Sequence, residues 1–162
     1  MDETTPPHRI RPASPADLSV IVEFNRLLAL ETEAKVLDPA TLQSGVACAL
    51  ADPDRLRYWV AEAGDPARVV GQAAITREWS DWRMGWIWWF QSVYVARDYR
   101  GRGIFRALYH HIRDQARSLP EVIGLRLYVE DANHPAQRTY QALGMTPGGY
   151  SVYQELWIPG LG

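Results

Sequence analysis

A short segment between two apolar stretches combines glycines and arginines in a way that suits anion binding. Gly101 and Gly103 lie in a polar turn that follows an apolar run, residues 86–95, and precedes a helical repeat beginning at Ile104. Four arginines flank this turn, namely Arg97, Arg100, Arg102 and Arg106. Because the first N–H groups of a helix have no partner within it and the helix dipole is positive there, such a turn can hold a phosphate or diphosphate.

The glycines alone are a weak signal, and a plain surface helix start with solvated arginines is an alternative. The turn lacks the Lys-Ser/Thr ending of a P-loop. It also lacks the third glycine of a dinucleotide-binding motif, since Arg106 occupies that position. The rest of the chain must therefore decide between an anion site and a solvated surface.

The composition is typical of one globular domain. The chain has 162 residues, of which 47% are hydrophobic and 22% charged, so we expect a single domain over residues 1–162. The net charge of −2 gives no reason to expect nucleic acid or a membrane surface as a partner. The acidic, proline-bearing residues 1–8 indicate a flexible tail rather than a signal sequence. We expect a cytoplasmic protein, and the sequence admits a homodimer.

The chain has one cysteine, Cys48, within an alanine-rich run. One cysteine excludes a disulfide framework and a cysteine metal site, which also favours a reducing compartment. We expect Cys48 to be a small buried core residue. The sequence predicts no metal site.

Hydrophobic periodicity and turn residues divide the chain into ten elements. Strands are expected at residues 8–12, 57–63, 69–78, 86–95, 123–130 and 150–158, and helices at residues 15–33, 39–50, 104–119 and 133–144. The order is β-α-α-β-β-β-α-β-α-β. Hairpins come first and β-α-β units follow. We therefore expect an α/β (α+β) fold with a mixed, mostly antiparallel central sheet and helices on both faces.

Three motifs on these elements resemble the GNAT superfamily of acyl-CoA-dependent N-acetyltransferases, and the resemblance covers residues 10–157. Arg100-x-x-Gly103 is similar to the family's Arg/Gln-x-x-Gly-x-Gly/Ala loop, although Phe105 stands where the family has a small residue. The run VYV at residues 93–95 leads into this loop. The resemblance implies that the fourth and fifth strands splay apart, often at a bulge, and that pantetheine lies in the gap.

The remaining motif is Asn133-x-x-Ala136-x-x-x-Tyr140, followed by Leu-Gly-Met. By resemblance, backbone groups of residues 93 and 95 bind the pantetheine amides, amides of residues 100–105 cradle the pyrophosphate, and Asn133 contacts the pantetheine arm. The residues that the resemblance assigns to acetyl-CoA are Val93, Tyr94, Val95, Arg100, Gly101, Arg102, Gly103, Ile104, Phe105, Asn133, Ala136 and Tyr140.

Acetyl transfer to an amine needs an acid for the leaving thiolate, and Tyr140 holds the family's position for it. Its hydroxyl stays protonated at neutral pH, whereas a thiol has a pKa of about 8.5. A backbone N–H of the residue 86–95 strand is expected to stabilise the oxyanion. The alternative for Tyr140 is a core aromatic residue on a helix face.

The base is less defined, because a primary amine with a pKa of about 10.4 must lose a proton before it attacks. Glu31 and Glu33 end the first helix, where the acceptor site of the family often lies, and they are our candidate catalytic carboxylates. Glu130 and a water relay are further candidates, and surface solvation is the alternative for each glutamate.

Five tryptophans fall between residues 79 and 89, and several of them are expected in the core. Trp79 and Trp82 lie in a polar corner, where they could help to bind a cationic amine by charge and cation–π attraction. The candidate substrate-binding residues are Glu31, Trp79, Trp82 and Gln91.

The sequence thus predicts an N-acetyltransferase that moves an acetyl group from acetyl-CoA to a primary amine, by direct attack in a ternary complex. The acceptor is expected to be a small molecule or a peptide amine. A non-catalytic acyl-CoA sensor on the same fold is one alternative, and a scaffold protein that packs a partner on its tryptophan-rich strand is another.

Overall fold

A computed structural model describes residues 8–158 of the chain, so the expected tail lies outside the described residues apart from His8. The chain divides into two compact units, Met1–Tyr128 and Val129–Gly162. The first unit holds the sheet and three of the helices, and the second holds the last helix. Each unit is taken by itself below.

The first unit begins with β1 (Arg9–Pro12), a short 3-10 helix η1 (Pro15–Asp17) and two helices, α1 (Leu18–Glu33) and α2 (Pro39–Ala51). η1 and α2 begin where the sequence places helix starts, because each follows a polar cap and has proline as its first residue. The carboxylate of Asp17 accepts from the Ser14 amide at 2.8 Å. The Asp38 carboxylate accepts from the Thr41 amide at 2.8 Å and caps α2.

Five strands form one mixed sheet in the order β1-β2-β3-β4-β5. Besides β1, the strands are β2 (Arg57–Ala63), β3 (Arg68–Ser80), β4 (Gly85–Val95) and β5 (Val122–Leu127). The first four pair antiparallel, and β5 pairs parallel to β4. The expected fold class, a mixed and mostly antiparallel sheet, is confirmed. β5 ends at Leu127, three residues before the expected end.

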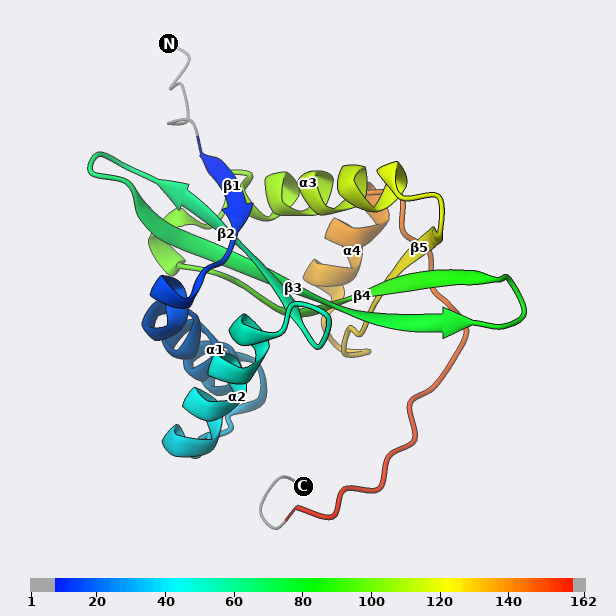
Figure 1. The fold of residues 1–162 in the computed structure, drawn as a ribbon, viewed down its shortest axis with the longest axis horizontal. Coiled ribbons are helices and arrows are strands. Elements are labelled where there is room, and N and C mark those ends of the chain that lie inside the picture. The colour runs from blue at the N-terminus through cyan, green and yellow to red at the C-terminus, as the bar shows by residue number, and fades with distance from the viewer. Residues whose placement is uncertain (1–7, 159–162) are drawn as a thin grey trace. The chain divides into compact units, whose positions relative to one another are not determined.

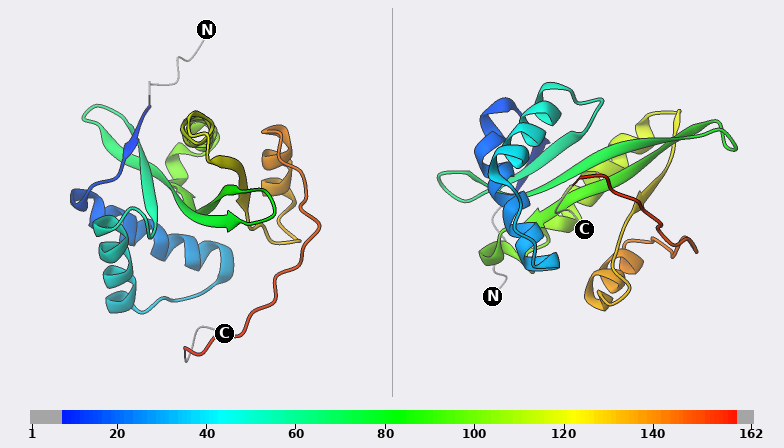
Figure 2. Two further views of the ribbon diagram at one scale, coloured as in Figure 1. Left: turned by 45° about the vertical axis from the view of Figure 1, so that its right-hand side comes forward. Right: turned by 90° about the horizontal axis from the view of Figure 1, so that it is seen from below.

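Helices cover both faces of this sheet, as Figure 1 and Figure 2 show for α1 and α2 on one face and α3 (Ile104–Ser118) on the other. On the first face, apolar side chains of α1, α2, β2 and β3 form a core of Ile21, Val46, Ala49, Tyr58, Val60 and Ala74. On the second face, Leu108 and Ile112 of α3 are fully buried, and Tyr109 stacks on Phe90 of β4 at 5.6 Å. The sheet is therefore held from both sides.

Cys48 is exposed, so its expected burial in the core is wrong. The helical repeat explains why. Val46 and Ala49 of α2 point into the core, whereas Cys48, between them in the sequence, lies on the opposite, outer side of the helix. None of the helices within residues 8–158 has the length and apolar character needed to cross a membrane.

The second unit contains α4 (His134–Ala142), whose first turn is capped by Asn133. The Asn133 side chain accepts from the amide of Ala136 at 3.2 Å. The strand expected at residues 150–158 is not formed, and the segment is extended without a strand assignment. Its residues can form a strand, but a strand is stable only when it is paired, and no hydrogen bond of this segment is found within the described chain.

Candidate active site

The predicted anion turn is an open loop that joins β4 to α3. β4 leads into a short 3-10 helix, η2 (Arg97–Tyr99), and the loop then starts α3. Gly101 and Gly103 both have left-handed backbones, with φ of 75° and 78°, a conformation that glycine adopts without strain. A Cβ added at either position would meet no atom within 4 Å. A ligand can therefore approach the loop backbone closely.

Hydrogen bonds close this segment on both sides of the glycines. The Tyr99 amide donates to the carbonyl of Ala96 at 2.9 Å, and the Ala107 amide donates to that of Gly103 at 3.0 Å. Between them, no hydrogen bond to another part of the described chain is found from the amides of residues 101–104. These donors lie at the positive end of α3, so the loop is suited to a diphosphate.

Phe105 replaces a small residue in the motif without closing the loop. Its ring lies 6.3 Å from that of Tyr109, one helical turn further along α3. The Arg102 guanidinium lies over the ring of Tyr99 at 5.3 Å. Both side chains therefore have contacts within the first unit.

β4 carries a bulge close to its end. In the β3–β4 ladder, Gln72 pairs with Tyr94 and Ala74 pairs with Gln91, so two residues of β4 face one residue of β3. Ser92 adopts a φ of 49°, which is uncommon for a residue with a side chain. The buried Gln72 side chain donates to the Ser92 carbonyl at 3.0 Å and thereby holds the bulge.

The pairing of β4 with β5 stops before this bulge. Phe90 pairs with Leu127, β5 ends there, and β4 continues to Val95. The Ala96 amide donates to the Val70 carbonyl of β3 at 2.8 Å, so the alternation of a strand turns the N–H and C=O of Val95 away from β3. Beyond Phe90 the Val95 N–H therefore points away from β3 on the edge that the expected splay exposes, while the Val95 carbonyl accepts from Arg100 Nε.

Glu31, at the end of α1, connects this helix to β4 and to the loop. The Tyr94 hydroxyl donates to Glu31 Oε1 at 2.9 Å, and Arg100 Nη2 donates to Glu31 Oε2 at 2.7 Å. Arg97 Nε reaches Oε1 at 3.2 Å, and Arg100 Nε donates to the Val95 carbonyl at 2.9 Å. The Arg100 side chain thus fixes the loop against α1, which leaves anion binding to the loop's backbone.

The same contacts define the charge of Glu31. Hydrogen bonds from Arg100 lower the pKa of the Glu31 carboxyl, with smaller contributions from Tyr94 and Arg97. Burial and the neighbouring Glu31 raise the pKa of Tyr94. A carboxylate held in this way is a weak base, so Glu31 suits a positioning role better than proton abstraction. Glu33 lies on the surface and pairs with Lys35 at 2.7 Å.

We predict that Glu31→Gln costs about 1 kcal/mol of unfolding free energy at pH 7, because the ion pairs are partly exposed. The folded pKa of Glu31 is below the unfolded one, so its contribution is present above the ordinary glutamate pKa of about 4.3 and is lost as the pH falls through the folded value. Urea unfolding across this range measures the difference between variant and parent. If the unfolding free energy of the variant stays below that of the parent by the same amount from pH 7 to pH 3, the ion pairs of Glu31 do not contribute to stability.

Comparison with known proteins agrees with this geometry. The profile of the acetyltransferase (GNAT) family matches residues 23–145. The chain belongs to the GNAT acetyltransferase family. No match was found among curated proteins.

Two solved structures of similar fold match most of the chain. A protein described as a possible acetyltransferase from Clostridium difficile 630 is 42% identical, with a TM-score of 0.85 over 93% of this chain and 98% of that one. A Trypanosoma brucei acetyltransferase is 21% identical, with a TM-score of 0.69 over 93% of this chain and 100% of that one. The second likeness shows the shared fold alone.

The predicted acceptor residues of this GNAT protein lie apart in the structure and do not line a common pocket. Trp79 pairs with Trp86 near the start of β4 and packs against it edge-on at 5.1 Å. Glu31 contacts Tyr94, which follows Trp86 by eight residues in β4. At about 3.3 Å per residue, the contact points of Trp79 and Glu31 on β4 are about 26 Å apart. Trp82 is 85% exposed in the turn between β3 and β4.

A cluster that sequence reasoning missed lies on β3, β4 and β5. The Glu78 carboxylate accepts from Trp89 Nε1 at 2.8 Å and from Arg126 Nη1 at 3.0 Å. The ring of Tyr128 lies 4.4 Å from that of Trp89. Glu78, Trp89 and Arg126 come from three strands and Tyr128 follows β5, and the four have no common motif, so only the strand register could have revealed them. Gln91, one position along this face of β4, donates to Thr76 Oγ1 at 3.3 Å.

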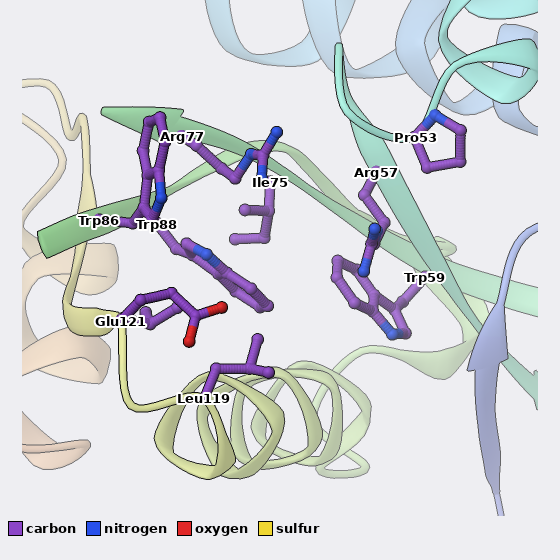
Figure 3. Close-up of a pocket in the computed structure, with 10 residues that line it drawn as sticks. Pro53, Arg57, Trp59, Ile75, Arg77, Trp86, Trp88, Leu119 and Glu121 are labelled. Carbon is purple, nitrogen blue, oxygen red and sulfur yellow. The ribbon is translucent and has the colours of Figure 1, made fainter. Parts of the chain in front are cut away.

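Figure 3 shows a separate pocket, of about 190 Å³, between the sheet and the end of α3. Trp59, Trp86 and Trp88 form much of its wall, and none of the predicted cofactor or acceptor residues lines it. Arg77 lies over the Trp86 ring at 5.1 Å and pairs with Asp54 at 3.1 Å. Trp59 and Trp88 are buried, and their rings lie 6.1 Å apart, so these two tryptophans pack within the core between the sheet and α3.

Asn133, Ala136 and Tyr140 belong to the second unit, so their approach to the loop of the first unit stays a prediction. Within that unit, Asn133 caps α4 and Tyr140 lies six residues after the start of this helix. Burial raises the pKa of the Tyr140 hydroxyl above its ordinary value. No group of three or more metal-ligating side chains is found among residues 8–158.

Proposed function

We propose that this protein transfers an acetyl group from acetyl-CoA to a primary amine, by direct attack within a ternary complex. The observation that carries the proposal is the set of unpartnered amides at residues 101–104, at the positive end of α3. Family membership supports acyl transfer in general. The amine and the ternary complex are our own inference.

The first unit supplies the binding groups. In our proposal the amides of residues 101–104 hold the diphosphate, and the backbone of β4 beyond Phe90 binds the pantetheine amides. Val95 suits this role because its N–H points away from β3. The Glu31–Arg100 pair keeps the loop in the conformation that presents these amides.

The second unit supplies the acid. Acetyl-CoA brings a thioester whose thiolate leaves more readily when it is protonated. The Tyr140 hydroxyl, whose pKa burial raises, remains protonated at neutral pH and can donate that proton. An N–H of β4 stabilises the oxyanion, and water carries the amine proton away because Glu31 is held by arginines.

The acceptor amine, in this proposal, reaches the thioester across the β4 face that carries Trp89 and Gln91. Both a small amine and a peptide N-terminus fit this description. The exposed free thiol of Cys48 agrees with a cytoplasmic, reducing setting.

Thermal unfolding with acetyl-CoA tests the proposal. At 100 times its dissociation constant, acetyl-CoA adds about 2.7 kcal/mol to the unfolding free energy. A screen of primary amines with thiol release as the readout then measures transfer, with Cys48→Ser used to remove the protein's own thiol from the signal. A melting shift without thiol release from any amine indicates an acyl-CoA sensor. No shift at millimolar acetyl-CoA contradicts binding altogether.

A further inference from the structure

A chain of buried polar side chains runs from β2 and α1 to the bulge in β4. The Tyr58 hydroxyl accepts from Asn25 Nδ2 at 3.0 Å, and Asn25 Oδ1 accepts from Gln72 Nε2 at 2.7 Å. The same Gln72 nitrogen donates to the Ser92 carbonyl at 3.0 Å. Tyr58, Asn25 and Gln72 are at most 9% exposed, and all four residues belong to the first unit. Because amide side chains are seldom buried to this degree, the chain requires an explanation beyond the filling of the core.

Two features of this chain are unfavourable for stability. Gln72 Oε1 is buried and has no hydrogen-bond partner within the described residues, which makes glutamine a costly choice at this position. Ser92 is held at a φ of 49°, where residues with a side chain are uncommon. The pairing of β4 with β5 ends at Phe90, two residues before Ser92. Strain of this kind gathers at functional sites, where the surrounding contacts maintain it.

The bulge decides which face of the sheet Tyr94 occupies. Side chains alternate along a strand, so residues four apart lie on the same face unless an extra residue intervenes. The ring of Phe90 lies 5.6 Å from Tyr109 of α3, whereas the ring of Tyr94 lies 5.1 Å from Phe24 of α1. The helices α1 and α3 cover opposite faces, as Figure 1 shows. The extra residue at Ser92 therefore turns Tyr94 from the α3 face to the α1 face.

This change of face connects the bulge to the anion-binding loop. On the α1 face the Tyr94 hydroxyl donates to Glu31 at 2.9 Å, and Arg100 donates to Glu31 at 2.7 Å. We propose that Gln72 is a positioning residue for acetyl-CoA binding, because its hydrogen bond to Ser92 fixes the register of the end of β4. That register brings Tyr94 to Glu31, which holds the loop through Arg100. The inference rests on the proposed function, in which the loop amides bind the diphosphate.

Calorimetry with acetyl-CoA tests this role. Gln72→Met removes both hydrogen bonds at nearly constant volume and is expected to weaken binding about tenfold, or about 1.4 kcal/mol, the size of one neutral hydrogen bond. Adding Ser92→Gly is expected to restore most of the affinity, since glycine adopts a positive φ without support. Asp38→Ala is the matched control. Loss of the α2 cap lowers stability and leaves the bulge in place, so affinity is expected to stay unchanged.

Nuclear Overhauser contacts between the rings of Phe24 and Tyr94 report the register without any ligand. They are expected in the parent and in the double variant, and they are expected to be absent in Gln72→Met. If Gln72→Met does not fold, Asn25→Ala replaces it, because it removes the support that Gln72 receives from α1. This variant is expected to weaken both the ring contact and the affinity.

The outcomes separate this role from the proposed function. If Gln72→Met keeps either the ring contact or the affinity of the parent, the proposal is overturned. It is also overturned if Ser92→Gly restores nothing, or if Asp38→Ala weakens binding as much as Gln72→Met does. A parent that binds no acetyl-CoA overturns the proposed function instead, and the ring contacts then still decide whether Gln72 sets the register of β4.

Discussion

Replacing Tyr140 with phenylalanine lowers kcat about 100-fold and leaves the affinity for acetyl-CoA unchanged, if Tyr140 protonates the leaving thiolate. General acid catalysis contributes about 10²–10⁴-fold, and phenylalanine keeps the ring while it removes the proton donor. Steady-state rates with a saturating amine measure kcat, and calorimetry with CoA measures binding. Burial of Tyr140 raises its pKa, so the donor is present throughout the neutral range.

Tyr153→Phe is the matched control for this substitution. Tyr153 follows α4 in the same unit and is almost fully exposed, so loss of its hydroxyl is expected to leave kcat unchanged. Equal turnover in Tyr140→Phe and the parent removes the acid assignment. A weaker affinity for CoA at unchanged kcat assigns Tyr140 a binding role instead.

Replacing Gly103 with alanine weakens acetyl-CoA binding by about 100-fold. Gly103 has a φ of 78°, so alanine there is strained by about 1–2 kcal/mol, and the loop amides shift to relieve the strain. Hydrogen bonds to a charged group contribute about 1.5–3 kcal/mol each, so losing one or two of them gives this change. Calorimetry with acetyl-CoA measures it.

Gly45→Ala separates this effect from a general glycine effect. Gly45 lies within α2, has space for a methyl group and has no positive φ, so alanine is expected to stabilise the protein by about 0.5–1 kcal/mol without changing acetyl-CoA affinity. The loop assignment fails if Gly103→Ala binds acetyl-CoA as tightly as Gly45→Ala does.

Local signals in the sequence defined most element boundaries. Asp38 before Pro39 marks the start of α2, and the glycines at 101 and 103 mark the start of α3, because caps and positive φ depend on single residues. The bounds of β2 were predicted to the residue, since turn residues lie on both sides of this largely apolar run. These features need no knowledge of distant contacts.

Features that depend on distant residues could not be predicted. The Glu31–Arg100 pair joins residues 69 positions apart, and no spacing rule connects them. Trp79 and Glu31 were grouped by chemistry, whereas the strand register separates them along β4. The capacity of residues 150–158 to form a strand was visible, but pairing depends on an edge that the sequence does not identify.

The position of the bulge in β4 also depends on distant residues. A residue with a side chain, such as Ser92, adopts a positive φ only when its surroundings impose that conformation. Here the hydrogen bond from Gln72, on another strand, imposes it. The resemblance to the family suggested a bulge, but no residue near Ser92 identifies its position.

The binding of a diphosphate by the loop amides is tested most directly by amide NMR. Titration of the ¹⁵N-labelled protein with CoA is expected to shift the resonances of residues 101–104 most strongly, and titration with pantetheine, which lacks the diphosphate, to leave them in place. Saturation with CoA that moves none of these four resonances would contradict the account.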